Sequence, residues 1–417
     1  MRIALIGDLQ YKPGEDAEIA GRMRQVAAQK PDLAVFLGDM GCNGATGTLA
    51  GMTACKALLE VLECPVAAIF GNHDVEYRPD DSVSKTPERW YRDLFNRQHP
   101  WQAVEMDGVF VLCLSVERQP EHTLMTQHAL YVSDAQYAWA RDQLRAHRHL
   151  PTIVFTHAPM AGSGLRCFPP IHSAATDAYL DHGFHAMRWR ELAFENPQIR
   201  LWCSAHFHMG HDYTAAVTWA QNLVHVSAGV MTSAARDGSR HTRILDIQDG
   251  MAAVCTLDHA SPHALRQDVV VDLTHGTRPQ GNFAEAIPGE VLLGEDRALA
   301  AYVCAKWNRA YLVTAAGKLW EYDWRLGELT GAISLRLSKP GEETLCVRDD
   351  RLYVRDAQAD PWSVGKDDPA RFERLSGYVP QASRPEKALA GQTLEKTGFS
   401  QRVSREGTYV RIALPEF

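Results

Sequence analysis

The stretch Val66-Ala67-Ala68-Ile69-Phe70-Gly71-Asn72-His73-Asp74 joins a short apolar run to a glycine and three polar side chains. Apolar runs of this length are typical of buried strands. The glycine permits a sharp turn, or a close approach of the backbone to another group. The stretch therefore predicts a strand that ends in a polar loop.

The same pattern recurs along the chain from residue 1 to about residue 258. Its other apolar runs are Ile3 to Ile6, Leu33 to Leu37, Val109 to Val116, Ile153 to Phe155, Ile199 to Cys203 and Val224 to Val226. Apolar residues at helical spacing separate several of these runs, and Ser133 is placed to cap one such helix. This pattern predicts layered α/β organisation, in which a binding crevice lies beyond the carboxyl ends of the strands.

Polar side chains that can bind metal ions follow five of these runs. They are Asp8 and Gln10, then Asp39, then Asn72, His73 and Asp74, then His157, and finally His206 and His208. Carboxylate and amide oxygens and imidazole nitrogens are ligands of hard and borderline cations. Taken singly, each has a structural explanation as a turn residue, a helix cap or a hydrogen-bonded histidine. Their ordered placement at five strand ends favours one shared site.

The ordered blocks resemble the calcineurin-like metallophosphoesterase family, whose motifs run D-x-H, G-D, G-N-H-D/E, H and G-H-x-H. The corresponding blocks here are Asp8-Leu9-Gln10, Gly38-Asp39, Gly71-Asn72-His73-Asp74, His157 and Ala205-His206-Phe207-His208. Two blocks depart from the motifs, because Gln10 replaces a histidine and Ala205 replaces a glycine. The resemblance covers about residues 1–258 and implies a four-layer α/β/β/α sandwich.

The resemblance also implies a centre of two divalent metal ions. One ion would be held by Asp8, Gln10, Asp39 and His208, and the other by Asp39, Asn72, His157 and His206. A hydroxide that bridges the ions would attack phosphorus, because coordination lowers the pKa of water from about 15.7 towards 7. His73 is expected to stabilise or protonate the leaving oxygen, and Asp74 to orient His73.

Gln10 bears on the choice of metal and substrate. Its amide oxygen is a harder ligand than an imidazole nitrogen and favours Mn or Mg, with Fe, Zn and Ni left open. Asp8 followed by Gln10-Tyr11 is similar to the Mn-dependent ADP-ribose/CDP-alcohol diphosphatase branch of the family. This similarity favours a small nucleotide-derived phosphoanhydride as substrate, and leaves phosphodiester or cyclic-nucleotide cleavage open.

Two loops offer candidate contacts with such a substrate. Arg166 could clamp a second phosphate, and Phe168 could stack on a base. Tyr77 and Arg78 follow the Asp74 block closely and suit the same roles. Exposed loops with an anchoring aromatic side chain are the alternative interpretation.

Composition restricts the class of protein. The formal net charge of −8 disfavours a binder of nucleic acid that relies on neutralising phosphates, although nucleic acid stays open as a partner. No apolar run approaches the roughly 18 residues that a membrane span needs. The N-terminus starts a strand at once and lacks the pattern of a signal peptide, so we expect a cytoplasmic protein. Nine cysteines without paired spacing indicate reduced thiols.

The chain is long enough for more than one domain. We expect a catalytic domain over residues 1–258 that ends in a hairpin around Asp249-Gly250. Residues 259–290 have the composition of a linker, although Val269 to Leu273 could form one more strand. Residues 291–417 predict a smaller all-β domain of unassigned role, which could dock a partner, form a homo-oligomer or cover the site.

Three alternatives share this fold. A nuclease would need a groove for a polymer, and the acidic net charge counts mildly against it. No feature of the sequence speaks for or against a phosphoprotein phosphatase. A non-catalytic scaffold would be expected to have lost metal ligands, whereas Gln10 alone departs from the expected ligand types.

Overall fold

The computed structural model describes residues 1–10, 14–41, 46–76, 86–120, 130–165, 179–181, 185–220, 222–261, 265–285, 298–304, 309–314, 317–323, 328–334, 345–348, 351–355, 403–406 and 409–413. The chain divides into two compact units. Unit 1 comprises Met1–Phe168 and Ala175–Ala286, and unit 2 comprises Pro169–Ala174 and Ile287–Phe417. Unit 1 contains every strand whose end was predicted to contribute to the site.

The first sheet of unit 1 has the strand order β13-β12-β11-β10-β1-β2-β3. Its strands are β1 (Arg2–Ile6), β2 (Leu33–Phe36), β3 (Val66–Ala68), β10 (His241–Gln248), β11 (Met251–Asp258), β12 (Arg266–Asp272) and β13 (Gln280–Gly281). β1, β2 and β3 are mutually parallel, whereas β10 pairs antiparallel with both β1 and β11. The hairpin between β10 and β11 turns at Asp249-Gly250, and both of these residues have positive φ.

The second sheet has the order β14-β8-β9-β7-β6-β5-β4. Its strands are β4 (Gln102–Met106), β5 (Val109–Cys113), β6 (Thr152–Thr156), β7 (Ile199–Ser204), β8 (Val217–Ala220), β9 (Leu223–Ser227) and β14 (Ala284–Glu285). β5, β6, β7 and β9 run parallel to one another. The first sheet thus has three parallel strands at one side and the second has a parallel centre, and the carboxyl ends of these two sets meet at one edge.

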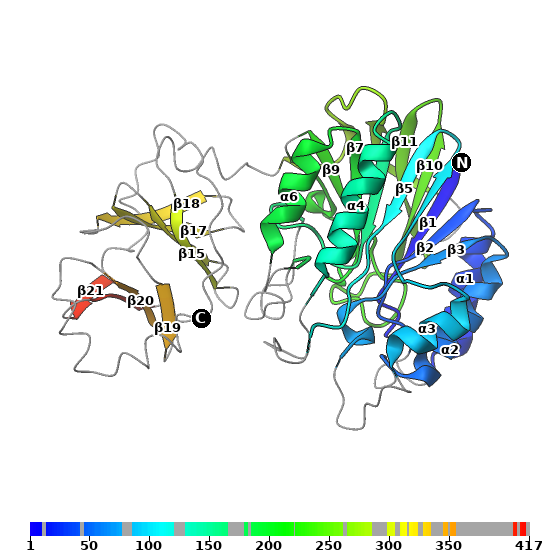
Figure 1. The fold of residues 1–417 in the computed structure, drawn as a ribbon, viewed down its shortest axis with the longest axis horizontal. Coiled ribbons are helices and arrows are strands. Elements are labelled where there is room, and N and C mark those ends of the chain that lie inside the picture. The colour runs from blue at the N-terminus through cyan, green and yellow to red at the C-terminus, as the bar shows by residue number, and fades with distance from the viewer. Residues whose placement is uncertain are drawn as a thin grey trace. The chain divides into compact units, whose positions relative to one another are not determined.

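Helices cover the outer face of each sheet. They are α1 (Asp16–Ala27), α2 (Leu49–Leu59), α3 (Pro87–Phe95), α4 (Asp134–Ala146) and α6 (Ala186–Glu195), with short 3₁₀ turns at Glu60–Leu62, Asn72–Asp74 and Thr214–Ala216. α1, α2 and α3 lie beside the first sheet, and α4 and α6 beside the second (Figure 1). Ser133 caps α4 as predicted, because its hydroxyl accepts the N–H of Gln136 at 3.2 Å.

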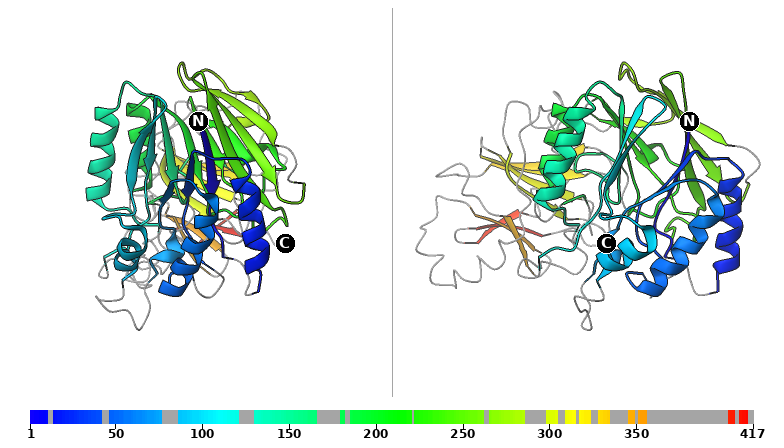
Figure 2. Two further views of the ribbon diagram at one scale, coloured as in Figure 1. Left: turned by 90° about the vertical axis from the view of Figure 1, so that its right-hand side faces the viewer. Right: turned by 45° about the vertical axis from the view of Figure 1, so that its right-hand side comes forward.

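Three apolar layers bind these elements together. In β1, Ile3 and Leu5 face the core between the two sheets, whereas Ala4 and Ile6 face the core under α1, α2 and α3. A third core lies between the second sheet and the helices α4 and α6. Figure 2 shows helices on opposite outer sides with the two sheets between them. The predicted α/β/β/α sandwich is confirmed.

The segment at 259–290, expected to be a linker, instead extends both sheets. β12 and β13 continue the first sheet, and β14 pairs with β8 in the second. The reason is that Val269, Val271 and Leu273 alternate into the core between the sheets. The additional strand that the sequence allowed at Val269 to Leu273 is therefore present. Unit 1 extends to Ala286.

The described part of unit 2 consists of strands in two antiparallel sheets. One contains β15 (Ala298–Cys304), β16 (Arg309–Thr314), β17 (Lys318–Asp323) and β18 (Glu328–Ser334). The other contains β19 (Leu345–Arg348), β20 (Arg351–Arg355), β21 (Val403–Glu406) and β22 (Tyr409–Ala413), in the order β19-β20-β22-β21. Within the described ranges of the whole chain, every helix is too short or too polar to cross a bilayer.

Candidate metal centre

The predicted metal ligands gather where the carboxyl ends of the two parallel strand sets meet. Asp8, Asp39 and Asn72 follow β1, β2 and β3 of the first sheet. His157 follows β6, and His206 and His208 follow β7, in the second sheet. Contacts between these side chains therefore join the two sheets at one edge.

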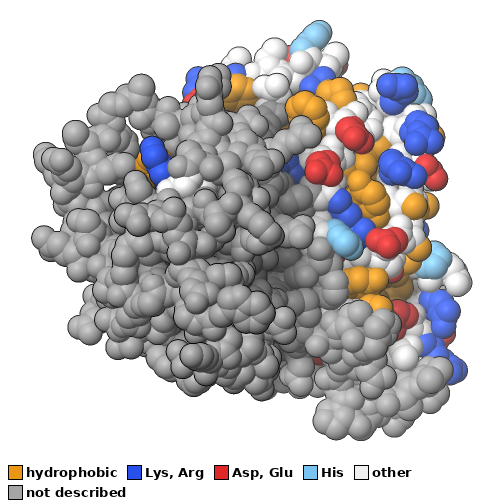
Figure 3. Space-filling view, turned by 60° about the vertical axis from the view of Figure 1, so that its left-hand side comes forward, with side chains coloured by type: hydrophobic (Ala, Val, Ile, Leu, Met, Phe, Trp, Pro, Cys, Tyr) orange, Lys and Arg blue, Asp and Glu red, His pale blue; other side chains and the backbone are white. Residues whose placement is uncertain are grey.

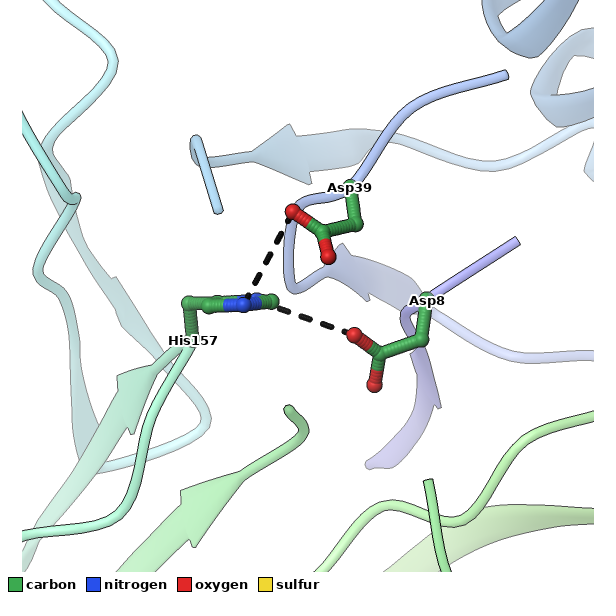
Figure 4. Close-up of side chains that lie close together, drawn as sticks. All are labelled: Asp8, Asp39 and His157. Carbon is green, nitrogen blue, oxygen red and sulfur yellow. Dashed lines mark ion pairs between the residues drawn. The ribbon is translucent and has the colours of Figure 1, made fainter. Parts of the chain in front are cut away.

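Asp8, Asp39 and His157 form the centre of this group. All three side chains are fully buried, and one potential ligand atom from each lies within 4.8 Å of the other two. The His157 ring stands between the carboxylates, with Nδ1 4.0 Å from Oδ1 of Asp8 and Nε2 3.8 Å from Oδ1 of Asp39. Figure 4 shows the two carboxylates pointing toward the ring from neighbouring loops. Such a group could hold a metal ion.

The environment of His157 leaves one of its nitrogens available to a cation. Nδ1 lies 2.7 Å from the carbonyl oxygen of Leu37 and donates its N–H there, so Nε2 carries a lone pair. This lone pair lies 3.0 Å from Oδ1 of Asn72 and 3.1 Å from Nδ1 of His206. Nε2 of His157 and Oδ1 of Asn72 are both electron-pair donors, and a cation near them would remove their mutual repulsion.

Asp8 and His208 form a second pair of potential metal-binding groups. Nδ1 of His208 lies 3.2 Å from the carbonyl oxygen of Ala234, so that Nε2 faces Oδ1 of Asp8 at 3.1 Å. This buried Oδ1 has no hydrogen-bond partner, whereas Oδ2 accepts the N–H of His206 at 2.8 Å. Burial alone would raise the pKa of Asp8, but in the absence of a metal ion a protonated His208 and the backbone N–H of His206 outweigh it and lower the pKa to about 2. A bound cation would take the place of the His208 proton. The ionised Asp8 and its neighbours fit a divalent cation.

Asp39 connects the two pairs. Its Oδ1 accepts the backbone N–H of His73 at 3.1 Å, and its Oδ2 accepts a hydrogen bond from the amide nitrogen of Gln10. Gln10 therefore points into the group with its amide nitrogen toward Asp39. The roles of Asp8, Gln10, Asp39, Asn72, His157, His206 and His208 as metal ligands stay predictions.

The Asp74 carboxylate is engaged by backbone N–H groups, and the role of Asp74 in orienting His73 stays a prediction. Its carboxylate accepts three backbone N–H groups, those of Asp39 at 2.7 Å, Met40 at 2.8 Å and Gly71 at 2.8 Å. Burial and the charge of Asp39 nevertheless raise the pKa of Asp74 to about 7. The carboxylate oxygens of Asp74 thus join the loop after β2 to the loop after β3. In this way Asp74 holds Asp39 in position.

Glu76 lies beside the ring of His73. Its carboxylate is hydrogen-bonded to Nδ1 of His73. Burial would lower the pKa of His73, but the charges of Asp39 and Glu76 and the hydrogen bond with Glu76 raise it to about 9. His73 is thus protonated at neutral pH. Glu76 was not among the predicted site residues, although its position three residues after His73 could have indicated it.

The backbone of the group adopts conformations that L-residues rarely take. Asp8, Asp39, His206 and His208 have φ of 51°, 60°, 69° and 52°, in the left-handed region. A Cβ on Gly71 would lie 2.2 Å from Oδ1 of Asp39 and 2.7 Å from Cε1 of His157. Conformations of this kind persist only where surrounding contacts stabilise them, and they concentrate at functional sites.

The structure does not describe the four residues that were predicted to contact the substrate. Tyr77, Arg78, Arg166 and Phe168 lie outside the described residues. Their roles stay predictions.

Comparison with known proteins gives the family. The family model for calcineurin-like phosphoesterases matches residues 1–210, which is half of the chain. The chain belongs to the calcineurin-like phosphoesterase family. Members of this family use divalent metal ions, and the Asp8, Asp39 and His157 group of this calcineurin-like phosphoesterase could hold one. No curated protein matches the sequence.

Solved structures with a similar fold are distant from this calcineurin-like phosphoesterase. A purple acid phosphatase from yellow lupin seeds is 12% identical, with a TM-score of 0.43, over 64% of this chain and 52% of its own. The chain thus spans about half of that phosphatase. GAP50, the anchor in the inner membrane complex of Plasmodium, is 12% identical, with a TM-score of 0.38, over 64% of this chain and 88% of its own. Neither similarity bears on substrate.

Proposed function

We propose that this calcineurin-like phosphoesterase holds two divalent metal ions and hydrolyses a phosphoanhydride or phosphodiester in a small, nucleotide-derived substrate. The observation that carries the proposal is the convergence of two buried pairs of electron-pair donors on Asp39. One pair is Asp8 with His208, and the other is Asn72 with His157. Two neighbouring cations would satisfy both pairs, with Asp39 between them.

Bound metal ions would supply Lewis-acid charge and an attacking water of lowered pKa. The residues of the chain supply the remaining functions. Asp8 is ionised at neutral pH, so it binds cations without first losing a proton. Asp74 fixes the loop that carries Asp39, through the N–H groups of Asp39 and Met40.

His73 is the proposed proton donor to the leaving oxygen. Its side chain is 37% exposed, so a substrate can reach it, and its hydrogen bond with Glu76 favours the protonated ring. Glu76 holds the ring by Nδ1. This arrangement suits any phosphate ester or anhydride whose leaving group needs a proton.

The finer proposal concerns metal and substrate class. The harder amide oxygen of Gln10, in place of an imidazole, favours Mn or Mg. The similarity of Asp8-Leu9-Gln10-Tyr11 to the ADP-ribose/CDP-alcohol diphosphatase branch favours a nucleoside diphosphate derivative. A non-catalytic scaffold of the same fold is the alternative that the following experiment separates from an enzyme.

The test is an activity panel on the purified chain, stripped of metal and reloaded with Mn. The panel holds a phosphomonoester, a phosphodiester, a cyclic nucleotide, ADP-ribose, a CDP-alcohol, a phosphopeptide and single-stranded RNA. We expect turnover of a nucleotide-derived small molecule. Two bound metal ions per chain without turnover of any member would establish the scaffold, and preference for RNA or the phosphopeptide would assign one of the other enzyme classes.

Asp39→Asn tests the assignment of the metal centre. We expect this variant to lose metal and to reduce kcat by roughly 100-fold or more, because it removes the charge between both pairs. Asp93→Asn is the matched control, since Asp93 is exposed on α3 and makes only a 3.9 Å contact with Arg89. Full activity in Asp39→Asn would show that the site is assigned incorrectly.

A further inference from the structure

A basic cleft lies at the opposite end of the second sheet from the metal centre. Its volume is about 580 Å³, and Pro151 and Gln198, which directly precede β6 and β7, line it. His157 follows β6, so the metal centre lies roughly 20 Å further along that strand at about 3.3 Å per residue. The cleft is therefore separate from the candidate catalytic site.

Four arginines line this basic cleft, namely Arg141, Arg145, Arg148 and Arg200, together with His149 and one acidic residue, Glu195. The chain as a whole has a net charge of −8, so this concentration of positive charge is local. Figure 3 shows basic side chains and a histidine, with acidic side chains beside them, at the upper right of the face that it presents. A concave surface of one sign focuses its field and attracts ions of the opposite sign.

The arginines on α4 are not neutralised by the rest of the described chain. Arg141 and Arg145 stand four residues apart, a spacing at which like charges destabilise a helix. Arg145 makes a 3.7 Å contact with Asp142 in which both side chains are largely exposed, and such contacts contribute little. Arg141 and Arg148 form no ion pair with any described residue. The repulsion among them would be relieved by a bound anion.

Helix capping does not account for these arginines either. Two of the last four carbonyls of α4 are taken by other groups, because Gln143 accepts from His147 and Leu144 accepts from the Gln198 side chain at 3.0 Å. In α6, the carbonyl of Leu192 accepts from the Asn196 side chain at 2.8 Å. The arginine head groups are thus left for another partner.

Arg200 is fixed in place before any ligand arrives. Its Nε donates to the carbonyl of Leu273 at 3.2 Å, and its Nη2 donates to the carbonyl of Thr274 at 3.2 Å. Gly276 makes room for this guanidinium, since a Cβ there would lie 2.0 Å from Nη1. A side chain held in this way loses little conformational entropy on binding.

We propose that the basic cleft binds a small anion that carries at least two phosphate groups. Arginine forks match the geometry of phosphate oxygens, and several arginines around one cleft suit more than one phosphate. The volume falls in the range of about 300 to 1,000 Å³ that is usual for small-ligand sites. Leu150 and Pro197 line the same cleft and offer apolar contact to the organic part of such a ligand. The proposal does not depend on the function proposed for the metal centre.

The test is calorimetric titration of the full chain with methylenediphosphonate, a diphosphate analogue that hydrolysis does not cleave, at one fixed excess of Mg²⁺. We expect two classes of site in the wild type. Asp39→Asn should lose the metal-centre class and keep the cleft class. The double variant Arg145→Gln/Arg148→Gln should keep the metal-centre class and weaken the cleft class by roughly tenfold or more.

Arg24→Gln is the matched control, because Arg24 is also an exposed arginine in the last turn of a helix, yet it lies outside the cleft. Unchanged binding by the double variant, or an equal loss in Arg24→Gln, would overturn the proposal. The proposal would also be overturned if inorganic phosphate bound at the cleft as tightly as the diphosphonate, or if a short RNA bound there more tightly. Thermal melting verifies that each variant is folded. The single variant Arg141→Gln must also weaken diphosphonate binding at the cleft if the proposal holds.

Discussion

Backbone carbonyls determine which ring nitrogen of two site histidines is available to a cation. His157 donates Nδ1–H to Leu37, and His208 donates Nδ1–H to Ala234, so each presents Nε2 to the centre of the site. These carbonyls are 120 and 26 residues away in the chain. The identity of a histidine ligand is therefore visible in the sequence, but the nitrogen that it presents is not.

Gln10 is the residue that distinguishes this site from the D-x-H pattern. We expect Gln10→His to shift the metal preference from Mn or Mg towards Zn or Fe, because imidazole is a softer ligand than an amide oxygen. Metal content after loading with an equimolar mixture, measured by elemental analysis, checks this. A metal profile identical to that of the wild type would count against Gln10 as a ligand. The ranking of substrates should change less than the ranking of metals.

Glu76 should control the protonation of His73. Burial disfavours the charged ring, and the charge of Asp39 and the contact with Glu76 together raise its pKa to about 9. In Glu76→Gln the pKa of His73 should fall, so the protonated donor is lost at lower pH. We expect the alkaline limb of the kcat profile to move to lower pH with KM and metal content unchanged.

Glu105→Gln is the control for Glu76→Gln, because Glu105 is exposed on β4. An alkaline limb at the same pH in Glu76→Gln and the wild type would rule out this role. A fall in kcat at every pH without movement of the limb would mean that Glu76 acts only on the local structure.

At the scale of elements, the site depends on close contact between strand ends. Asp74 links the loops after β2 and β3 through the N–H groups of Asp39 and Gly71, and Gly38 has a φ of 94° where its loop meets Gly71. A Cβ on Gly38 would lie 2.1 Å from the nitrogen of Gly71. The loops can approach only because both positions are glycine.

Gly71→Ala should therefore disrupt the metal centre. The added methyl group would meet Oδ1 of Asp39 at 2.2 Å and must displace that carboxylate. We expect metal affinity to fall by roughly tenfold or more, which corresponds to about 1.4 kcal/mol, and metal titration measures it. Gly21→Ala on α1 is the control, because its nearest neighbour would be the flexible end of Arg24 at 3.8 Å. Full metal affinity in Gly71→Ala would contradict the assigned geometry.

At the scale of the whole molecule, all the predicted metal ligands belong to unit 1. Unit 1 also has its own three apolar layers, and its last described strand, β14, pairs within its own second sheet. A chain that ends after Ala286 should therefore keep the metal stoichiometry of the full chain. Elemental analysis of the truncated protein checks this expectation.

Activity and mass in solution of the same truncated protein address unit 2. Loss of activity with metal retained would assign unit 2 a role in substrate binding. A fall from oligomer to monomer would assign it to assembly. Loss of metal itself would mean that the site requires residues beyond Ala286.

The sequence by itself indicated the layered α/β organisation, the succession of strands along the chain and the polar residues at each strand end, and its family resemblance implied the sandwich. These properties depend on local periodicity and on side-chain chemistry, which a sequence displays directly. It did not reveal that residues 266–285 extend both sheets, because strand pairing there depends on partners far away in the chain.

Only the tertiary structure decided how the site residues act on one another. It placed Glu76 against Nδ1 of His73, and it holds Asp8 and Asp39 in left-handed conformations that their residue types do not predict. Hydrogen bonds, burial and charges from both sheets determine these features, and they exist only once the chain is folded.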